Sequence, residues 1–156
     1  MDIFLSEDEI MNLIKEPKRL SEDLTNLNMK SPKKGHYEKE IIILRDDGSR
    51  FEIKIRQSID NVMDFSVILG YIPYESEKMF RLRRYNGKRI HTNRIEREII
   101  FGYHIHTATE RYQKAGYDED AFAIVTGEFY DLNGAIECFI KDCSIIFPTS
   151  NQVKLF

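Results

Sequence analysis

The chain has 156 residues, of which 42% are hydrophobic and 31% charged, so it can bury a core and is expected to form a single domain over residues 1–156. Its net charge of -3 gives no overall reason to expect a nucleic-acid partner. The N-terminus lacks signal-peptide features, no apolar run approaches the ~20 residues needed to span a bilayer, and only two cysteines are present. We therefore expect a cytoplasmic protein with reduced thiols and no membrane partner.

The first predicted element is a helix that begins after Ser6. Ser6 is a suitable N-cap, and Glu9 three residues later completes a capping box. Apolar residues then recur at helical spacing until Pro17, which limits the helix. The polar stretch 18–35 is expected to form a short helical turn followed by an exposed connection.

From residue 36 the hydrophobic period changes to two, which is typical of strands. Asp47-Gly48 and Asn86-Gly87 are predicted to form turns between strands. Inward and outward residues alternate, so the sheet is expected to have one dry and one wet face. The six predicted strands are two within 36–57, then 63–72, 78–85, 103–108 and 121–126.

The last predicted element is a helix within 131–145, with Asp131 as its N-cap. Its apolar residues form one stripe, and both Cys138 and Cys143 are interpreted as packing residues. The strands follow one another too closely for helical crossovers. These patterns predict an α+β fold, a mostly antiparallel five- to six-stranded sheet with an N-terminal and a C-terminal helix, the C-terminal helix covering the dry face.

A basic segment covers residues 78–97, with eight Lys or Arg and one acidic residue. Such a patch within an acidic chain would attract an anion to one side of the molecule. Phe80 and Leu82 are expected to face the core, and Arg81 and Arg83 the wet face. The residues expected to bind an anion or nucleic acid are Arg81, Arg83, Arg84, Lys88, Arg89, Arg111 and Tyr112.

Three histidines, His91, His104 and His106, are the candidate catalytic residues. His104 and His106 stand two apart in a predicted strand, so they share a face. Imidazoles near their ordinary pKa of about 6.5, together with arginine, could act as acid and base on a phosphodiester without a metal or another cofactor. Two alternatives stay open: a metal site completed by His91 or Glu110, and plain binding of an anionic partner. The histidines could also be inert, and the arginines a solvated face that protects a sheet edge.

The chain resembles a family of uncharacterised bacterial and phage proteins of similar length. The resemblance rests on the segments "FRLRRYNGKRIHTN", "HIHTATERY", "AFAI" and "AIECFIKDCSI". The chain departs from the pattern at Arg83, where the family has an acidic residue soon after Arg-Leu, and at Arg94, where proline is common. The matching positions are Arg81, Leu82, Gly87, His91, Asn93, His104, His106, Phe139 and Cys143.

Two functions follow from these patterns. In the first, a mobile-element or toxin-like protein acts as a metal-independent endoribonuclease through its histidines and arginines. In the second, a non-catalytic module uses a basic sheet face to bind RNA, another nucleic acid or an acidic protein. The layout also resembles that of small toxins of toxin–antitoxin pairs, a likeness of layout alone.

Overall fold

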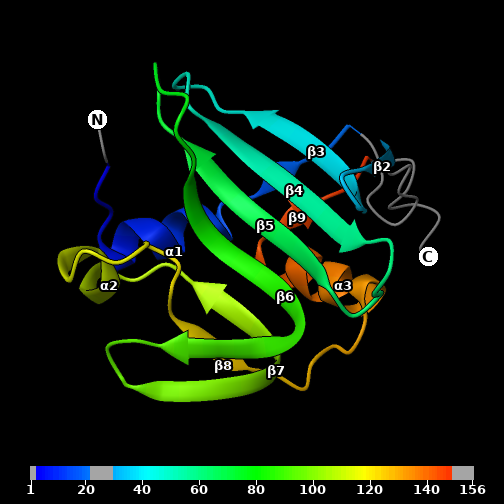
Figure 1. Cartoon of the computed structure of the whole chain (residues 1–156). Coiled ribbons are helices and arrows are strands. Elements are labelled where there is room, and N and C mark those ends of the chain that lie inside the picture. Colours follow the sequence, from blue (N-terminus) through cyan, green and yellow to red (C-terminus); the bar gives the residue numbers. More distant parts are fainter. Residues whose placement is uncertain (1–2, 22–29, 149–156) are drawn as a thin grey trace.

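The computed structural model describes residues 3–21 and 30–148. Its main feature is an antiparallel seven-stranded sheet, which confirms the predicted α+β class but contains more strands than expected (Figure 1). A second, two-stranded parallel sheet joins β1 (Lys18–Arg19) to β9 (Ile145–Ile146). In order across the main sheet, the strands are β2 (Lys30–Lys33), β3 (His36–Leu44), β4 (Arg50–Ser58), β5 (Phe65–Ile72), β6 (Phe80–Asn93), β7 (Glu98–Thr107) and β8 (Ala123–Val125).

The structure contains both helices that the sequence predicts. In α1 (Glu7–Lys15), the Ser6 hydroxyl accepts from the Glu9 N–H and the Glu9 carboxylate accepts from the Ser6 N–H, so the capping box is confirmed. In α3 (Leu132–Asp142), the Asp131 carboxylate accepts from the Gly134 N–H at 2.7 Å. The short α2 (Glu110–Lys114) was not predicted. None of the helices in the described ranges is long and apolar enough to cross a membrane.

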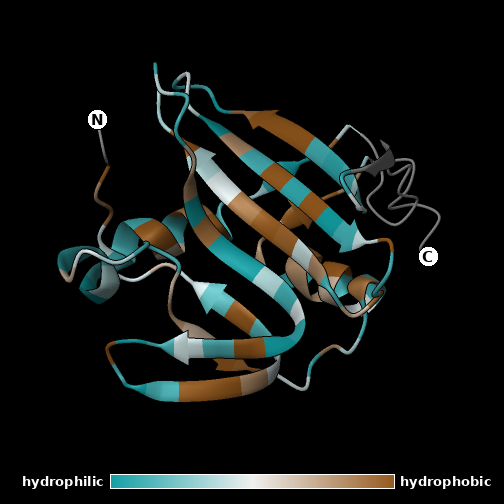
Figure 2. Cartoon of the chain, viewed as in Figure 1, coloured by the Kyte–Doolittle hydropathy of each residue, from teal (hydrophilic) through white to brown (hydrophobic). Residues whose placement is uncertain are grey.

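The hydrophobic core lies between one face of the sheet and the helices α1 and α3. Figure 2 shows the alternation of hydrophobic and hydrophilic residues along the central strands that produces this dry face. Ile53 of β4, Val67 of β5, Leu82 of β6 and Phe139 of α3 are all fully buried. The C-terminal helix therefore covers the dry face, as predicted. Cys143 is also buried, at the C-cap of α3.

Asn86-Gly87 does not form the predicted turn, because β6 continues through it to Asn93. The pairing with β7 shifts register between Asn86 and Arg89, and Gly102 of β7 adopts a φ of +134° that suits glycine. A Cβ at Gly87 would lie 1.8 Å from the Met63 carbonyl oxygen, so only glycine fits. At these points both strands bend, and residues 89–102, the outer hairpin, turn back across the end of the sheet (Figure 1).

The stretch 18–35 differs from the expected helical turn and exposed connection. It contributes β1, which pairs with β9, and β2, which extends the main sheet at its edge. Residues 22–29, where part of that expectation falls, lie outside the described residues.

Candidate functional site

The three histidines of the sequence motifs form one cluster. His104 and His106 lie on the sheet face away from the helices, and the bend of the outer hairpin brings His91 to them. The ring centroids are 4.7 Å apart for His91–His106, 5.0 Å for His104–His106 and 5.8 Å for His91–His104. The structure thus brings together all three candidate catalytic residues. His104 and His106 are buried, however, and His91 is half-buried.

Each imidazole contacts a backbone carbonyl oxygen. His104 Nδ1 lies 2.8 Å from Gly102 O, His106 Nδ1 lies 2.7 Å from Asp120 O, and His91 Nε2 lies 2.7 Å from Ala121 O. Since a carbonyl oxygen only accepts, the contacting ring nitrogen must donate its N–H, which assigns the tautomer of the neutral ring. Two of these contacts hold residues 120–121 against the histidines.

The acidic run Asp118–Asp120 was not singled out in the sequence, yet it is the partner of two predicted anion-binding arginines. Asp120 lies 3.3 Å from Arg81 Nε and 3.2 Å from Arg84 Nε, and Arg81 also contacts the carboxylates of Asp118 and Glu119. The Arg81 backbone N–H donates to Glu119 Oε2 at 2.9 Å. These arginines therefore bind a segment of their own chain.

Asn93, the last residue of the His-x-Asn motif, completes this attachment. Its side-chain amide donates to Ala123 O at 2.8 Å and its Oδ1 accepts from the Ala123 N–H at 2.9 Å. Ala123 belongs to the edge strand β8, so the amide occupies backbone groups that a further strand would otherwise pair with. We call residues 118–123 the clamped segment. The outer hairpin and this segment thus hold each other over the histidines.

Arg83 does not join the histidines, contrary to the expectation from alternation. Leu69 pairs with Arg83 while Gly70 pairs with Arg81, so Leu82 is an extra residue that reverses the side-chain alternation. The Arg83 guanidinium carbon lies 5.5 Å from the Tyr85 ring centroid, on the helix-covered face. Arg84, one residue later, takes the place beside His106.

The remaining predicted anion-binding residues are dispersed. Arg89 forms an ion pair with Asp64, and Arg111 one with Glu96. The Tyr112 ring is buried and its hydroxyl donates to Glu96 Oε1 at 2.6 Å. Lys88 is exposed, with its ammonium 5.5 Å from the Phe101 ring centroid. Carboxylates from other segments therefore neutralise much of the basic segment 78–97.

Burial sets the protonation states in the cluster. It lowers the pKa of His106 to about 2, with the nearby Arg84 charge as the next cause, and it lowers the pKa of His104 in the same way. It also raises the pKa of the Asp120 carboxyl, an effect that the Arg84 and Arg81 charges oppose. At neutral pH His104 and His106 are thus uncharged, and neither can serve as a protonated general acid.

The cluster contains two buried acceptors without a partner in the described part of the chain, His104 Nε2 and Asn86 Oδ1. These residues face each other across β6 and β7. Within that same part, no group of three or more His, Cys, Asp or Glu side chains is placed to hold a metal ion.

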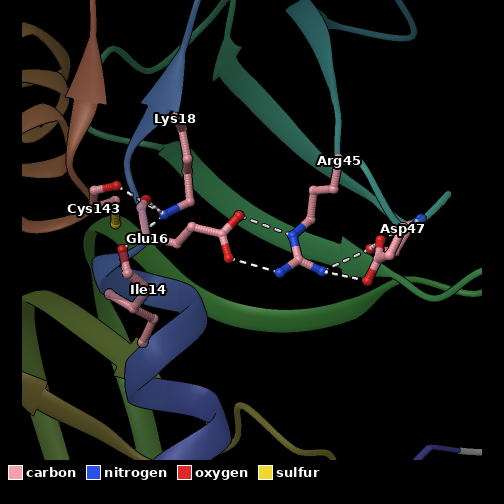
Figure 3. Close-up of polar contacts among 7 residues, drawn as sticks. Ile14, Glu16, Lys18, Arg45, Asp47 and Cys143 are labelled. Atoms are coloured by element: carbon pink, nitrogen blue, oxygen red, sulfur yellow. Dashed lines mark hydrogen bonds and ion pairs between the residues drawn. The ribbon is translucent and has the colours of Figure 1, made fainter.

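A second buried polar site surrounds Lys18, which the sequence did not indicate (Figure 3). The fully buried Lys18 ammonium donates to Ile14 O at 2.8 Å, Glu16 O at 2.7 Å and Cys143 O at 2.9 Å. It thereby joins the C-terminal ends of α1 and α3. Burial lowers the pKa of Lys18 to about 8, which leaves it mostly charged at neutral pH.

The outer face of the outer hairpin carries large apolar side chains in solvent. Ile90, Ile99 and Phe101 are 67%, 74% and 59% exposed, and we call these three residues the hairpin patch. Ile90 and Phe101 are direct cross-strand partners, and Ile99 is two residues from Phe101 on the same face. The opposite face of the same strands carries the histidines.

The comparisons with known proteins place the chain in a family. The model of the "Family of unknown function (DUF6978)" matches residues 5–145, so the chain belongs to that family. This confirms the resemblance to an uncharacterised family of similar length. No curated protein and no solved structure matches the chain.

Proposed function

We propose that this member of the family is a non-catalytic protein-binding module and that it engages a partner protein through the hairpin patch. The observation that carries the proposal is the solvent exposure of Ile90, Ile99 and Phe101 on one face of paired strands. Contiguous exposed apolar side chains are typical of protein interaction surfaces. The resemblance noted above adds a phage or mobile-element setting.

The charges around the patch favour an acidic protein over a nucleic acid. Lys88, Arg94 and Arg97 are exposed, and no carboxylate in the described ranges forms an ion pair with them. A nucleic-acid interface is more polar and more strongly positive than an apolar patch with a few cations at its rim. Arg81, Arg84 and Arg89, which would have to strengthen the positive charge, already have carboxylate partners.

The histidine cluster also favours the binding module over the endoribonuclease. An endoribonuclease would require an imidazole that can be protonated near neutral pH and that a phosphate can reach. His104 and His106 are buried and uncharged, and His106 is bonded to the clamped segment. The contacts of His91 with Ala121 and of Asn93 with Ala123 instead attach the outer hairpin, which carries the patch, to the clamped segment.

The test replaces Phe101 with a photo-crosslinking phenylalanine analogue in cells that express the protein natively. The matched control carries the analogue at Tyr74, which is 65% exposed in the turn after β5. We expect a specific adduct from position 101 only. The captured protein, purified, should bind the wild type and the variant Tyr74→Asp equally, and Phe101→Asp at least tenfold more weakly. Equal binding by all three would contradict the proposal.

A ribonuclease assay is the second part of the test of the proposed function. Total RNA is incubated with the wild type and with His106→Asn, whose amide can still donate to Asp120 O. We expect no cleavage by either protein. Cleavage by the wild type that His106→Asn loses would replace the proposed function with the endoribonuclease.

A further inference from the structure

The outer hairpin has an open strand edge beside the hairpin patch. Strand β8 pairs with β7 only at His104–His106, and the Thr126 N–H and Thr107 N–H bonds flank this pairing, the first donating to Tyr103 O and the second to Phe122 O. Between Glu98 and Gly102, no strand in the described ranges lies on that side of β7.

The backbone groups at this edge can be assigned from the same bonds. In an antiparallel strand, the N–H and C=O of one residue point to the same side, and the side alternates from residue to residue. Tyr103 O and the Thr107 N–H point toward β8. The backbone groups of Ile99 and Phe101 therefore point to the open edge.

The open edge of β7 is unprotected, in contrast to the edge of β8. Edge strands are usually protected by charges, proline, bulges or a covering element. At β8, the Asn93 amide occupies the backbone groups of Ala123. At β7, the residues whose backbone groups face outward are Ile99 and Phe101, and their side chains are also exposed. Backbone and side chains thus both favour an added strand.

We propose that the strand added at this edge is β7 of a second copy, paired antiparallel about a two-fold axis at Ile100. Ile99 of one copy would then lie opposite Phe101 of the other, twice by symmetry, and each such pair would exchange two backbone hydrogen bonds. The two hairpin patches would form one continuous apolar surface. The inference rests on the proposed function, because the partner-binding surface is then incomplete in a single copy.

Charge complementarity supports a second copy as the occupant. In the two-fold register, Glu98 lies opposite Gly102 of the other copy. Gly102 pairs with Arg89 in its own hairpin, so Glu98 and that Arg89 occupy one row on the same face. This places opposite charges one strand apart across the junction at both ends, in addition to the Arg89–Asp64 ion pair within each copy. A strand from an unrelated protein would need this pattern of apolar and acidic residues by chance.

The experiment uses charge reversal on the full chain. The variants I99K/F101K and I99E/F101E place like charges opposite each other in a self-pair, but opposite charges when the two variants are mixed. The matched control is Y74K, since Tyr74 is 65% exposed and lies in the turn after β5, outside the outer hairpin. Circular dichroism verifies that each variant is folded, as expected from the exposure of these side chains.

Sedimentation equilibrium should detect dimers of the wild type and of Y74K at concentrations on the order of 100 µM. Each double variant should associate at least tenfold more weakly, and an equimolar mixture should restore dimers. A monomeric wild type at that concentration, or double variants that dimerise as well as the wild type, would overturn the inference.

The result of this dimerisation experiment can be distinguished from the result of the test of the proposed function. A monomeric chain that still gives the Phe101 adduct and binds the captured protein leaves the module in place and removes the second copy. A dimer that breaks and recovers as described, with no Phe101-dependent partner other than the second copy, supports the edge pairing and removes the module.

Discussion

Lys18 and the histidine cluster are both buried polar sites, but they differ in how completely their hydrogen bonds are satisfied. The three N–H donors of Lys18 contact three carbonyl oxygens, at the ends of two helices (Figure 3). In the histidine cluster, His104 Nε2 and Asn86 Oδ1 have no partner in the described ranges. A satisfied buried charge is a fixed structural contact, whereas buried imidazoles with incomplete hydrogen bonding make the histidine cluster sensitive to pH.

The largest effect is expected from Lys18→Met. The substitution keeps the length of the side chain but leaves three buried carbonyl oxygens without their donor. The free energy of unfolding should fall by about 3 to 5 kcal/mol, measured by urea denaturation. Lys15→Met, at the exposed C-terminal end of α1, should change it by less than about 0.5 kcal/mol. Similar losses for the two variants would remove the structural role of Lys18.

The next effect is expected from Asn93→Ala, which tests the attachment of the clamped segment. The variant loses both bonds to Ala123 and exposes the edge of β8. We expect a loss of about 2 to 3 kcal/mol in the free energy of unfolding. Amide hydrogen exchange at Ala123 should accelerate more than at Ile53 in the core. Unchanged exchange at Ala123 would show that Asn93 does not secure the strand.

The dependence of stability on acidic pH distinguishes the histidine cluster from the Lys18 site. The pKa of His106 is about 2 in the folded state and about 6.5 when unfolded, so the unfolded chain binds more protons between these values. Stability is therefore retained above pH 6.5 and lost as the pH falls below it. Burial acts on His104 in the same direction, while the raised pKa of Asp120 opposes both.

We expect the free energy of unfolding to fall by about 2 kcal/mol between pH 6.5 and 4.5, from urea titrations at several pH values. His106→Asn should reduce this dependence, because asparagine does not titrate. His36→Asn is the control, since that histidine lies on β3 outside the cluster. A pH dependence that His36→Asn removes and His106→Asn preserves would contradict the assignment.

The smallest effect is expected from Glu16→Gln, beside the Lys18 site. The Glu16 carboxylate forms a two-point contact with Arg45, at 2.7 and 2.9 Å, and both side chains are partly exposed. The loss should be about 1 kcal/mol or less and should diminish in high salt. The Glu16 carbonyl, which accepts from Lys18, is unchanged. A salt-independent loss as large as that of Lys18→Met would mean that the two contacts act as one unit.

Local sequence rules determined much of this protein. Ser6 with Glu9, and Asp131, marked where the two main helices begin, because a cap depends only on nearby residues. Alternation placed His104 and His106 on one face, and Ile53 and Ile55 in the core. The motif residues identified the family and the positions that meet in the histidine cluster.

Only the tertiary structure decided which side chains meet and which are covered. One extra residue at Leu82 moved Arg83 to the helix face, and the bend at Gly87 and Gly102 turned an expected open surface into a closed cluster. The carboxylates that neutralise Arg81 and Arg84 lie more than thirty residues away in the chain. Alternation is a property of neighbours in sequence, whereas bulges, register and burial depend on strands and segments that approach only in the folded chain.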